Sequence, residues 1–152
     1  MADKTYVAVI GPGDASEDEL ASAEAVGRGL AQRGATIVTG GLGGVMAAAS
    51  KGAREAGGTT VGILPGLDRS AANPWVEVAI PTGLGELRNG LVVRAADAVI
   101  AIGGGHGTLS EIGLALKANT PVIGINTWQI EGVEHTNSPE QAVQRALTAR
   151  TE

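Results

Sequence analysis

The stretch AVIAIGGGHGTLSE, residues 98–111, places an apolar run directly before a glycine-rich loop. The five apolar residues Ala98–Ile102 predict a buried strand, and the apolar segment from Ile112 to Ala118 predicts a helix. A strand, a glycine loop and a helix in this order form the unit that binds ligands at the carboxyl edge of parallel sheets. A tight turn without a ligand would explain the glycines equally well, so the rest of the chain has to decide between the two.

The same alternation of short β-branched runs and longer helical stretches continues through the chain, which is typical of a parallel sheet covered by helices on both faces. Further strands are predicted at residues 6–10, 36–39, 60–64 and 122–125, with a weaker edge strand at 76–80. Helices are expected at residues 16–33, 44–56 and 85–96, after the loop at 103–107, and from Ser138 onward, whereas residues 128–137 are expected to be irregular. The predicted fold is a three-layer, Rossmann-like, doubly wound α/β sheet, and the 152 residues fit one domain spanning 1–152.

Composition excludes several classes of partner. The net charge is −5 and the basic residues are scattered, which argues against nucleic acid and anionic membranes. There are no cysteines and the two histidines lie far apart, so no metal site is predicted. No apolar segment approaches the roughly 20 residues that span a bilayer, and the start of the chain does not resemble a signal peptide. We therefore expect a cytoplasmic protein with no nucleic-acid or membrane partner.

Glycines cluster after three of the predicted strands. The clusters are Gly11 and Gly13; Gly40, Gly41, Gly43 and Gly44; and Gly103, Gly104, Gly105 and Gly107. Loops that follow parallel strands lie at one edge of the sheet. Glycine lets backbone amides approach a phosphate, and the helix that follows adds unpaired donors and its positive dipole end. Three such clusters at one edge favour a small phosphorylated ligand over three unrelated turns.

A dinucleotide cofactor is the first ligand to consider, because Gly11-Pro-Gly13 resembles the start of the NAD fingerprint. The position of the third glycine holds Ser16, however, and the second strand ends at Thr39 without the acidic residue that would bind a ribose hydroxyl. The sequence therefore argues against NAD binding of the usual kind.

Two charged residues are candidates for chemistry. Arg88 falls in the first turn of an expected helix, where the dipole disfavours a cation; either Glu86 or a bound anion would offset it. Thr108 and Glu111 have capping-box spacing, which makes Glu111 a candidate helix cap. Beside a bound sugar, the same carboxylate could instead stabilise positive charge at an anomeric carbon or orient water. Both interpretations of each residue remain open at this point.

Four segments together resemble the LOG family of Rossmann-fold proteins, and in particular its branch of molybdenum cofactor carrier proteins. They are GGLGGVM (40–46), AREAGGTTVGILP (53–65), GELRN (85–89) and GGGHGTLSE (103–111), within a match that runs from Val7 to Ile125. LOG enzymes are phosphoribohydrolases that release a nucleobase and ribose 5-phosphate from nucleoside monophosphates. Their motif PGGxGTxxE supplies a phosphate loop and a catalytic glutamate, and an upstream arginine is its partner.

The resemblance implies a set of site residues in this chain. Arg88 and Glu111 are the implied catalytic pair. The ligand- and phosphate-binding residues expected from the loops and the resemblance are Gly11, Gly13, Gly40, Gly41, Gly43, Gly44, Met46, Asn89, Gly104, Gly105, His106, Gly107 and Thr108. For His106 and Asn89, a solvated loop histidine and a helix-end amide are the simpler interpretations.

Two departures from the family pattern bear on activity: Gly103 replaces the leading proline, and Arg88 lies in GELRN where the family has a more basic segment ending in ERK. The first hypothesis is a carrier that binds the molybdenum cofactor pterin or an AMP-like nucleotide without chemistry. The second is a phosphoribohydrolase that uses Arg88 and Glu111, and the third is a scaffold with structural glycines. None requires a further cofactor, and the resemblance implies a homodimer or homotetramer.

Overall fold

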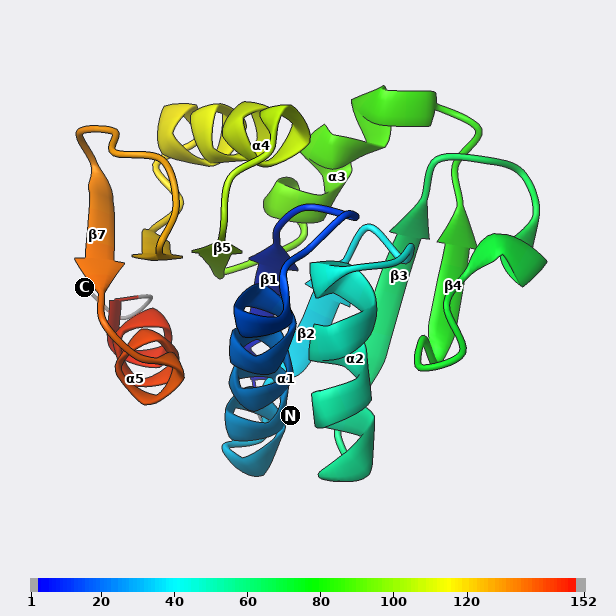
Figure 1. The fold of residues 1–152 in the computed structure, drawn as a ribbon. Helices are drawn as coiled ribbons and strands as arrows, with labels where there is room; N and C mark the ends of the chain where they lie inside the picture. Colours follow the sequence, from blue (N-terminus) through cyan, green and yellow to red (C-terminus); the bar gives the residue numbers. More distant parts are fainter. Residues whose placement is uncertain (1–2, 150–152) are drawn as a thin grey trace.

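A computed structural model describes residues 3–149, which form one seven-stranded parallel sheet between two layers of helices (Figure 1). The strands are β1 (Tyr6–Ile10), β2 (Thr36–Thr39), β3 (Thr60–Leu64), β4 (Val78–Pro81), β5 (Ala98–Ile102), β6 (Val122–Ile125) and β7 (Val133–Thr136). Their order across the sheet is β4-β3-β2-β1-β5-β6-β7, and every neighbouring pair is parallel. The predicted doubly wound α/β fold is confirmed.

The helices are α1 (Glu17–Gln32), α2 (Val45–Glu55), α3 (Arg88–Arg94), α4 (His106–Lys117) and α5 (Pro139–Ala149), with short 3-10 turns η1 (Arg69–Ala71) and η2 (Gly85–Leu87). The predicted capping box at the start of α1 is present, since Ser16 and Glu19 each accept a hydrogen bond from the other's backbone amide. The helix expected at 85–96 is shorter, because Gly85 has a φ of +61° and the chain passes through η2 before α3 begins.

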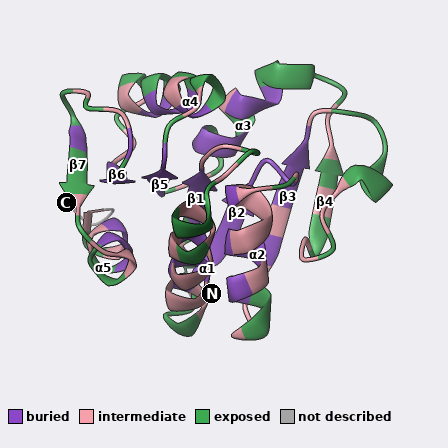
Figure 2. Ribbon diagram, in the orientation of Figure 1, coloured by how far each residue is buried: buried purple, intermediate pink, exposed green. Residues whose placement is uncertain are grey.

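Two aliphatic clusters fill the spaces between the layers. Successive residues of a strand point to opposite faces, so Val7 and Val9 pack beneath α1, α2 and α5. Ala8 and Ile10 pack beneath α3 and α4 on the other face. Strands β2, β5 and β6 are buried along their length, and β1 is buried from Val7 onward (Figure 2), which explains why most of their residues are apolar.

The expectation that residues 128–137 are irregular is wrong for their second half. Val133–Thr136 form β7, which pairs with β6 through the register Val122↔Val133 to Ile125↔Thr136. Only Val133 in this edge strand is buried. A short strand with polar residues carries little of the apolar signal that identifies buried strands.

The strand order reverses between β1 and β5, which lie side by side. The loop after β1 and the loop after β5 therefore leave adjacent strand ends and run toward opposite faces of the sheet. This switch point is where open α/β sheets bind their ligands.

Candidate ligand-binding site

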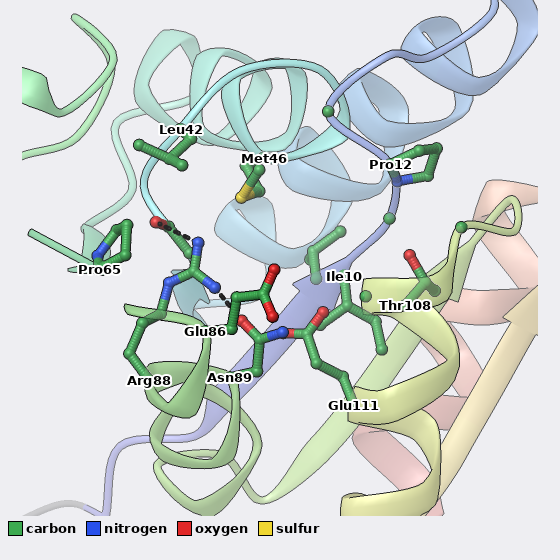
Figure 3. A pocket seen from close by; sticks show the side chains of 16 residues that line it. Ile10, Pro12, Leu42, Met46, Pro65, Glu86, Arg88, Asn89, Thr108 and Glu111 are labelled. Atoms are coloured by element: carbon green, nitrogen blue, oxygen red, sulfur yellow. Dashed lines mark hydrogen bonds between the residues drawn. The ribbon is translucent and has the colours of Figure 1, made fainter. Parts of the chain in front are cut away.

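A pocket of about 400 Å³ opens at the switch point and is bordered by all three glycine loops (Figure 3). Ten of the predicted site residues line it: Gly11, Gly13, Gly40, Met46, Arg88, Asn89, Gly105, Gly107, Thr108 and Glu111. Arg88 and Asn89 enter from α3, whereas Thr108 and Glu111 enter from α4 on the opposite side. The tertiary fold thus brings residues from distant segments to one cavity.

Five predicted residues lie outside this pocket: Gly41, Gly43, Gly44, Gly104 and His106. Gly44 instead allows the second loop to approach the first, because a Cβ on it would lie 2.3 Å from the carbonyl oxygen of Pro12 and its φ is +64°. His106 lines an adjacent groove of about 460 Å³. That groove shares Glu86, Asn89 and Gly107 with the pocket.

Six lining residues were not among the predicted site residues: Val9, Ile10, Pro12, Leu42, Pro65 and Glu86. Pro12 and Leu42 sit between glycines that were predicted, so the loop pattern itself was the available signal. Asn73 holds the second loop from outside by donating to the carbonyl oxygen of Leu42 at 2.8 Å. Nothing in the sequence pattern indicates this contact across 31 residues.

The predicted capping box of Thr108 and Glu111 is wrong. Helix α4 begins at His106 with Gly105 as its N-cap, and no side chain caps it. Thr108 is therefore the third residue inside the helix and Glu111 lies one turn further on. Residues three apart share a helix face, so the same spacing that imitates a cap directs both side chains to the pocket.

Two buried side-chain donors in the pocket have no hydrogen-bond partner within residues 3–149. They are the hydroxyl of Thr108, in a residue only 2% exposed, and Nε of Arg88. Leaving a buried polar group unsatisfied costs about 1–3 kcal/mol. Both atoms belong to residues that line the same pocket. Because both atoms have almost no exposed surface in this structure, an acceptor atom of a ligand would supply the missing partner once the two side chains turn toward the cavity.

The guanidinium of Arg88 is fixed by its neighbours and not by Glu111. It donates to the side-chain oxygen of Asn89 and, at 3.4 Å, to the carbonyl oxygen of Gly40. Burial lowers the pKa of Arg88, while the charges of Glu111 and then Glu86 oppose that change. Arginine remains a cation in proteins, so the pocket contains one fixed positive charge.

Glu111 is a buried carboxyl group with an altered acidity. Burial raises its pKa from the ordinary 4.5 to about 7, although the positive charge of Arg88 acts in the opposite direction. Desolvation disfavours the ionised form of a carboxyl group. Near neutral pH, the side chain is therefore divided between its acid and its carboxylate form.

The residue that replaces the family's leading proline has a conformation that proline cannot adopt. Gly103 has a φ of +71°, whereas the proline ring fixes φ near −65°. The carboxylate of Glu19 also occupies the space where a Cβ of residue 103 would lie. Both the backbone conformation of the loop and its close contact with α1 therefore favour glycine over proline at this position.

No cluster of three or more His, Cys, Asp or Glu side chains suited to a metal ion occurs within residues 3–149. Within the same residues, no helix has the length and apolar character needed to cross a membrane. The pocket thus has one fixed cation, two buried donors without partners and the amino end of α4. These features place a few polar groups in a largely apolar pocket at the switch point of a Rossmann-like sheet, the class of site that suits an anionic small molecule.

The sequence profile of the SLOG cluster4 family (LDcluster4) matches residues 4–151, and the chain belongs to this family. An uncharacterized protein of Archaeoglobus fulgidus is 39% identical over 144 residues, which cover 94% of this chain and 95% of that protein. The molybdenum cofactor binding protein of the phototrophic bacterium Rippkaea orientalis has a similar structure, with a TM-score of 0.93 and 37% identity over 98% of this chain and 99% of that one. The molybdenum cofactor carrier protein of Chlamydomonas reinhardtii matches with a TM-score of 0.91 and 34% identity, over 99% of this chain and all of that one.

Proposed function

We propose that this protein binds the molybdenum cofactor, a phosphorylated pterin, and carries it without cleaving it. The phosphate lies at the amino end of α4, against the backbone of Gly105 and Gly107 and the hydroxyl of Thr108. The observation that carries this proposal is the pair of buried donors without partners, on Thr108 and Arg88, in one pocket. A phosphate monoester is mostly a dianion at neutral pH, so its oxygens act mainly as hydrogen-bond acceptors and match these donors.

Two positive features of the pocket support an anionic ligand and oppose the carboxylate of Glu86, which also lines it. Arg88 supplies a positive charge, and the first amides of α4 add the positive end of the helix dipole. Burial holds the pKa of Glu111 at about 7. Its repulsion of a phosphate is therefore weaker at neutral pH than that of an ordinary carboxylate.

The size of the pocket and the related structures support a pterin. About 400 Å³ lies within the range of small-molecule sites, and the adjoining groove offers room for a ligand that extends past Asn89. The two related structures described above are those of a molybdenum cofactor binding protein and of a molybdenum cofactor carrier protein. In this chain, Gly105, Gly107, Thr108 and Arg88 would hold the phosphate of such a cargo.

One observation favours a second function, hydrolysis of nucleoside 5′-monophosphates. A carboxyl group with a pKa of about 7 is suited to proton transfer at neutral pH. Glu111 also faces the pocket from the side opposite Arg88, as an acid or base beside a bound ribose would. In this reaction, water would add to the anomeric carbon as the bond from that carbon to the base nitrogen breaks. Glu111 would take a proton from the water or give one to the departing base, and Arg88 would orient the ribose phosphate.

One assay separates the two functions. The purified protein and its Glu111→Gln variant are incubated at pH 7 with AMP, GMP and CMP, and ribose 5-phosphate is measured; binding of the molybdenum cofactor is measured in parallel. We expect cofactor binding and no ribose 5-phosphate. Release of ribose 5-phosphate by the wild type but not by the variant would reject the carrier function in favour of the hydrolase. Absence of both cofactor binding and ribose 5-phosphate release would support the third hypothesis, a scaffold with structural glycines.

A further inference from the structure

The glycine loop after β5 is held by two side chains from the segment that follows β6. The hydroxyl of Thr127 donates to the carbonyl oxygen of Gly103 at 2.6 Å, and the indole Nε1 of Trp128 donates to the carbonyl oxygen of Gly105 at 3.1 Å. Strands β5 and β6 are paired up to Ile102 and Ile125, so the two segments emerge side by side. Alternate carbonyls of the loop are thus bound by consecutive residues.

Trp128 also contacts the residues on either side of Gly105. Its Nε1 lies 3.3 Å from the position that a Cβ of Gly104 would occupy. Its ring stacks on that of His106, with the centroids 6.3 Å apart and the planes 24° from parallel. A single side chain therefore covers three successive residues at the start of α4.

A run of three glycines has no side chains that could fix its own conformation, and glycine loses more backbone freedom on ordering than any other residue. In a trans peptide, the carbonyl and the following amide point in opposite directions. The carbonyl of Gly105 accepts from Trp128 and, at 2.9 Å, from the backbone amide of Leu109 inside α4, so the amide of His106 points the other way, out of the amino end of the helix. Groups held in place before a ligand arrives bind it at a smaller entropic cost.

We propose that Trp128 and Thr127 are positioning residues of the ligand site: they fix the carbonyls of Gly105 and Gly103 and thereby hold the peptide planes 103–104 and 105–106 of the loop whose backbone receives the phosphate. This assignment rests on the proposed function, since it concerns the same phosphate position. Neither side chain lines the pocket. Both act through the backbone of the loop.

The chain contains two tryptophans, which provides a matched control. Trp75 lies far from the loop in sequence, with the ammonium of Lys51 5.9 Å from its ring centroid, and it does not line the pocket. Trp128→Phe keeps an aromatic ring but removes the N–H donor. Thr127→Val removes the hydroxyl at constant shape, Thr127→Ser restores it, and Trp75→Phe leaves the loop unchanged.

The first measurement needs no ligand: amide hydrogen exchange followed by NMR. We expect Trp128→Phe and Thr127→Val to accelerate exchange of the amides of residues 104–108 and to leave the amides of β1 and β5 unchanged. Trp75→Phe and Thr127→Ser should match the wild type at these residues. Unchanged exchange at residues 104–108 in both loop variants would overturn the assignment.

The second measurement is the affinity for the molybdenum cofactor, AMP, GMP and inorganic phosphate, by calorimetry. Loss of one hydrogen bond that orders the site should weaken binding about 3- to 10-fold, from the usual net value of such a bond. Trp75→Phe should leave affinity unchanged and make Trp128 the only tryptophan, so that saturation with ligand changes its emission. Wild-type affinity in Trp128→Phe and Thr127→Val, with lowered melting temperatures, would assign them a structural role only. If the wild type binds none of the four compounds, the proposed function fails and this assignment fails with it.

Discussion

Replacing Glu111 with glutamine tests the burial of the pocket carboxyl through the pH dependence of stability. In the folded protein its pKa is about 7, against 4.5 ordinarily. The folded state therefore keeps a proton that the unfolded chain releases, and the free energy of unfolding falls as pH rises from 4.5 to 7. At 1.36 kcal/mol per pKa unit, this loss amounts to about 3 kcal/mol and is complete above pH 7.

Glutamine cannot ionise, so the variant escapes this loss. We expect the free energy of unfolding of Glu111→Gln, measured by urea denaturation, to increase relative to that of the wild type between pH 5 and 7.5. Above pH 7.5 the difference between the two should stay constant. Glu86→Gln, at an exposed carboxylate bordering the same pocket, is the control and should parallel the wild type. Parallel curves for Glu111→Gln and the wild type would refute the reasoning, because Glu111 would then titrate as a solvated or fully paired carboxylate.

Four further changes probe the site and its surroundings. Thr108→Val should raise the free energy of unfolding in urea by about 1 kcal/mol, because it removes an unsatisfied buried hydroxyl. The same change should weaken ligand binding by about 3- to 10-fold. A lower free energy of unfolding with unchanged affinity would contradict this prediction. Gly105→Val should abolish ligand binding in calorimetry. It should lower the free energy of unfolding by no more than about 1 kcal/mol, since a Cβ at this position meets no atom closer than 3.7 Å. The control Gly43→Val, in open space outside the pocket, should bind the ligand normally. Gly103→Pro should lower the free energy of unfolding in urea by at least about 1 kcal/mol because the φ of Gly103 is +71°; a variant as stable as the wild type would mean that the loop adopts another conformation. The side chain of Leu87 is 79% exposed, and we expect a second copy of the chain to cover it. Light scattering should therefore give the mass of at least a dimer for the wild type and of a monomer for Leu87→Asp; a monomeric wild type would refute this.

The order of strands and helices could be predicted because a parallel sheet covered on both faces needs apolar residues at nearly every strand position. The runs Tyr6–Ile10 and Ala98–Ile102 have this property, and their bounds agree with the structure. The strand Val133–Thr136 could not be predicted in the same way, because an edge strand needs only one buried residue here and carries polar residues elsewhere.

The candidate site was predictable as a set of loops but not as a set of contacts. Glycine clusters after parallel strands indicate one edge, and the pocket lies there. The spacing of Thr108 and Glu111 suits both a helix cap and a pair on one helix face, and only the position of the first helical residue, His106, separates the two. The bond from Arg88 to the carbonyl of Gly40, 48 residues away, depends on the packing of α3 against the sheet.

The acidity of Glu111 and the support from Trp128 also depend on tertiary structure. The pKa of a carboxyl group follows its burial and the charges around it, which sequence spacing does not specify. The sequence around Trp128 predicts only an irregular connection. The indole N–H of Trp128 reaches the carbonyl oxygen of Gly105 because β5 and β6 are neighbours in the sheet.

A crystal structure of the protein soaked with AMP at pH 7 tests the central claim most directly, because it locates the phosphate and reports on the N-glycosidic bond at once. We predict a phosphate against the backbone of Gly105 and Gly107, within hydrogen-bond distance of the hydroxyl of Thr108, with the bond between base and ribose intact. A phosphate bound elsewhere with this pocket vacant, or a pocket that contains ribose 5-phosphate, would contradict the account.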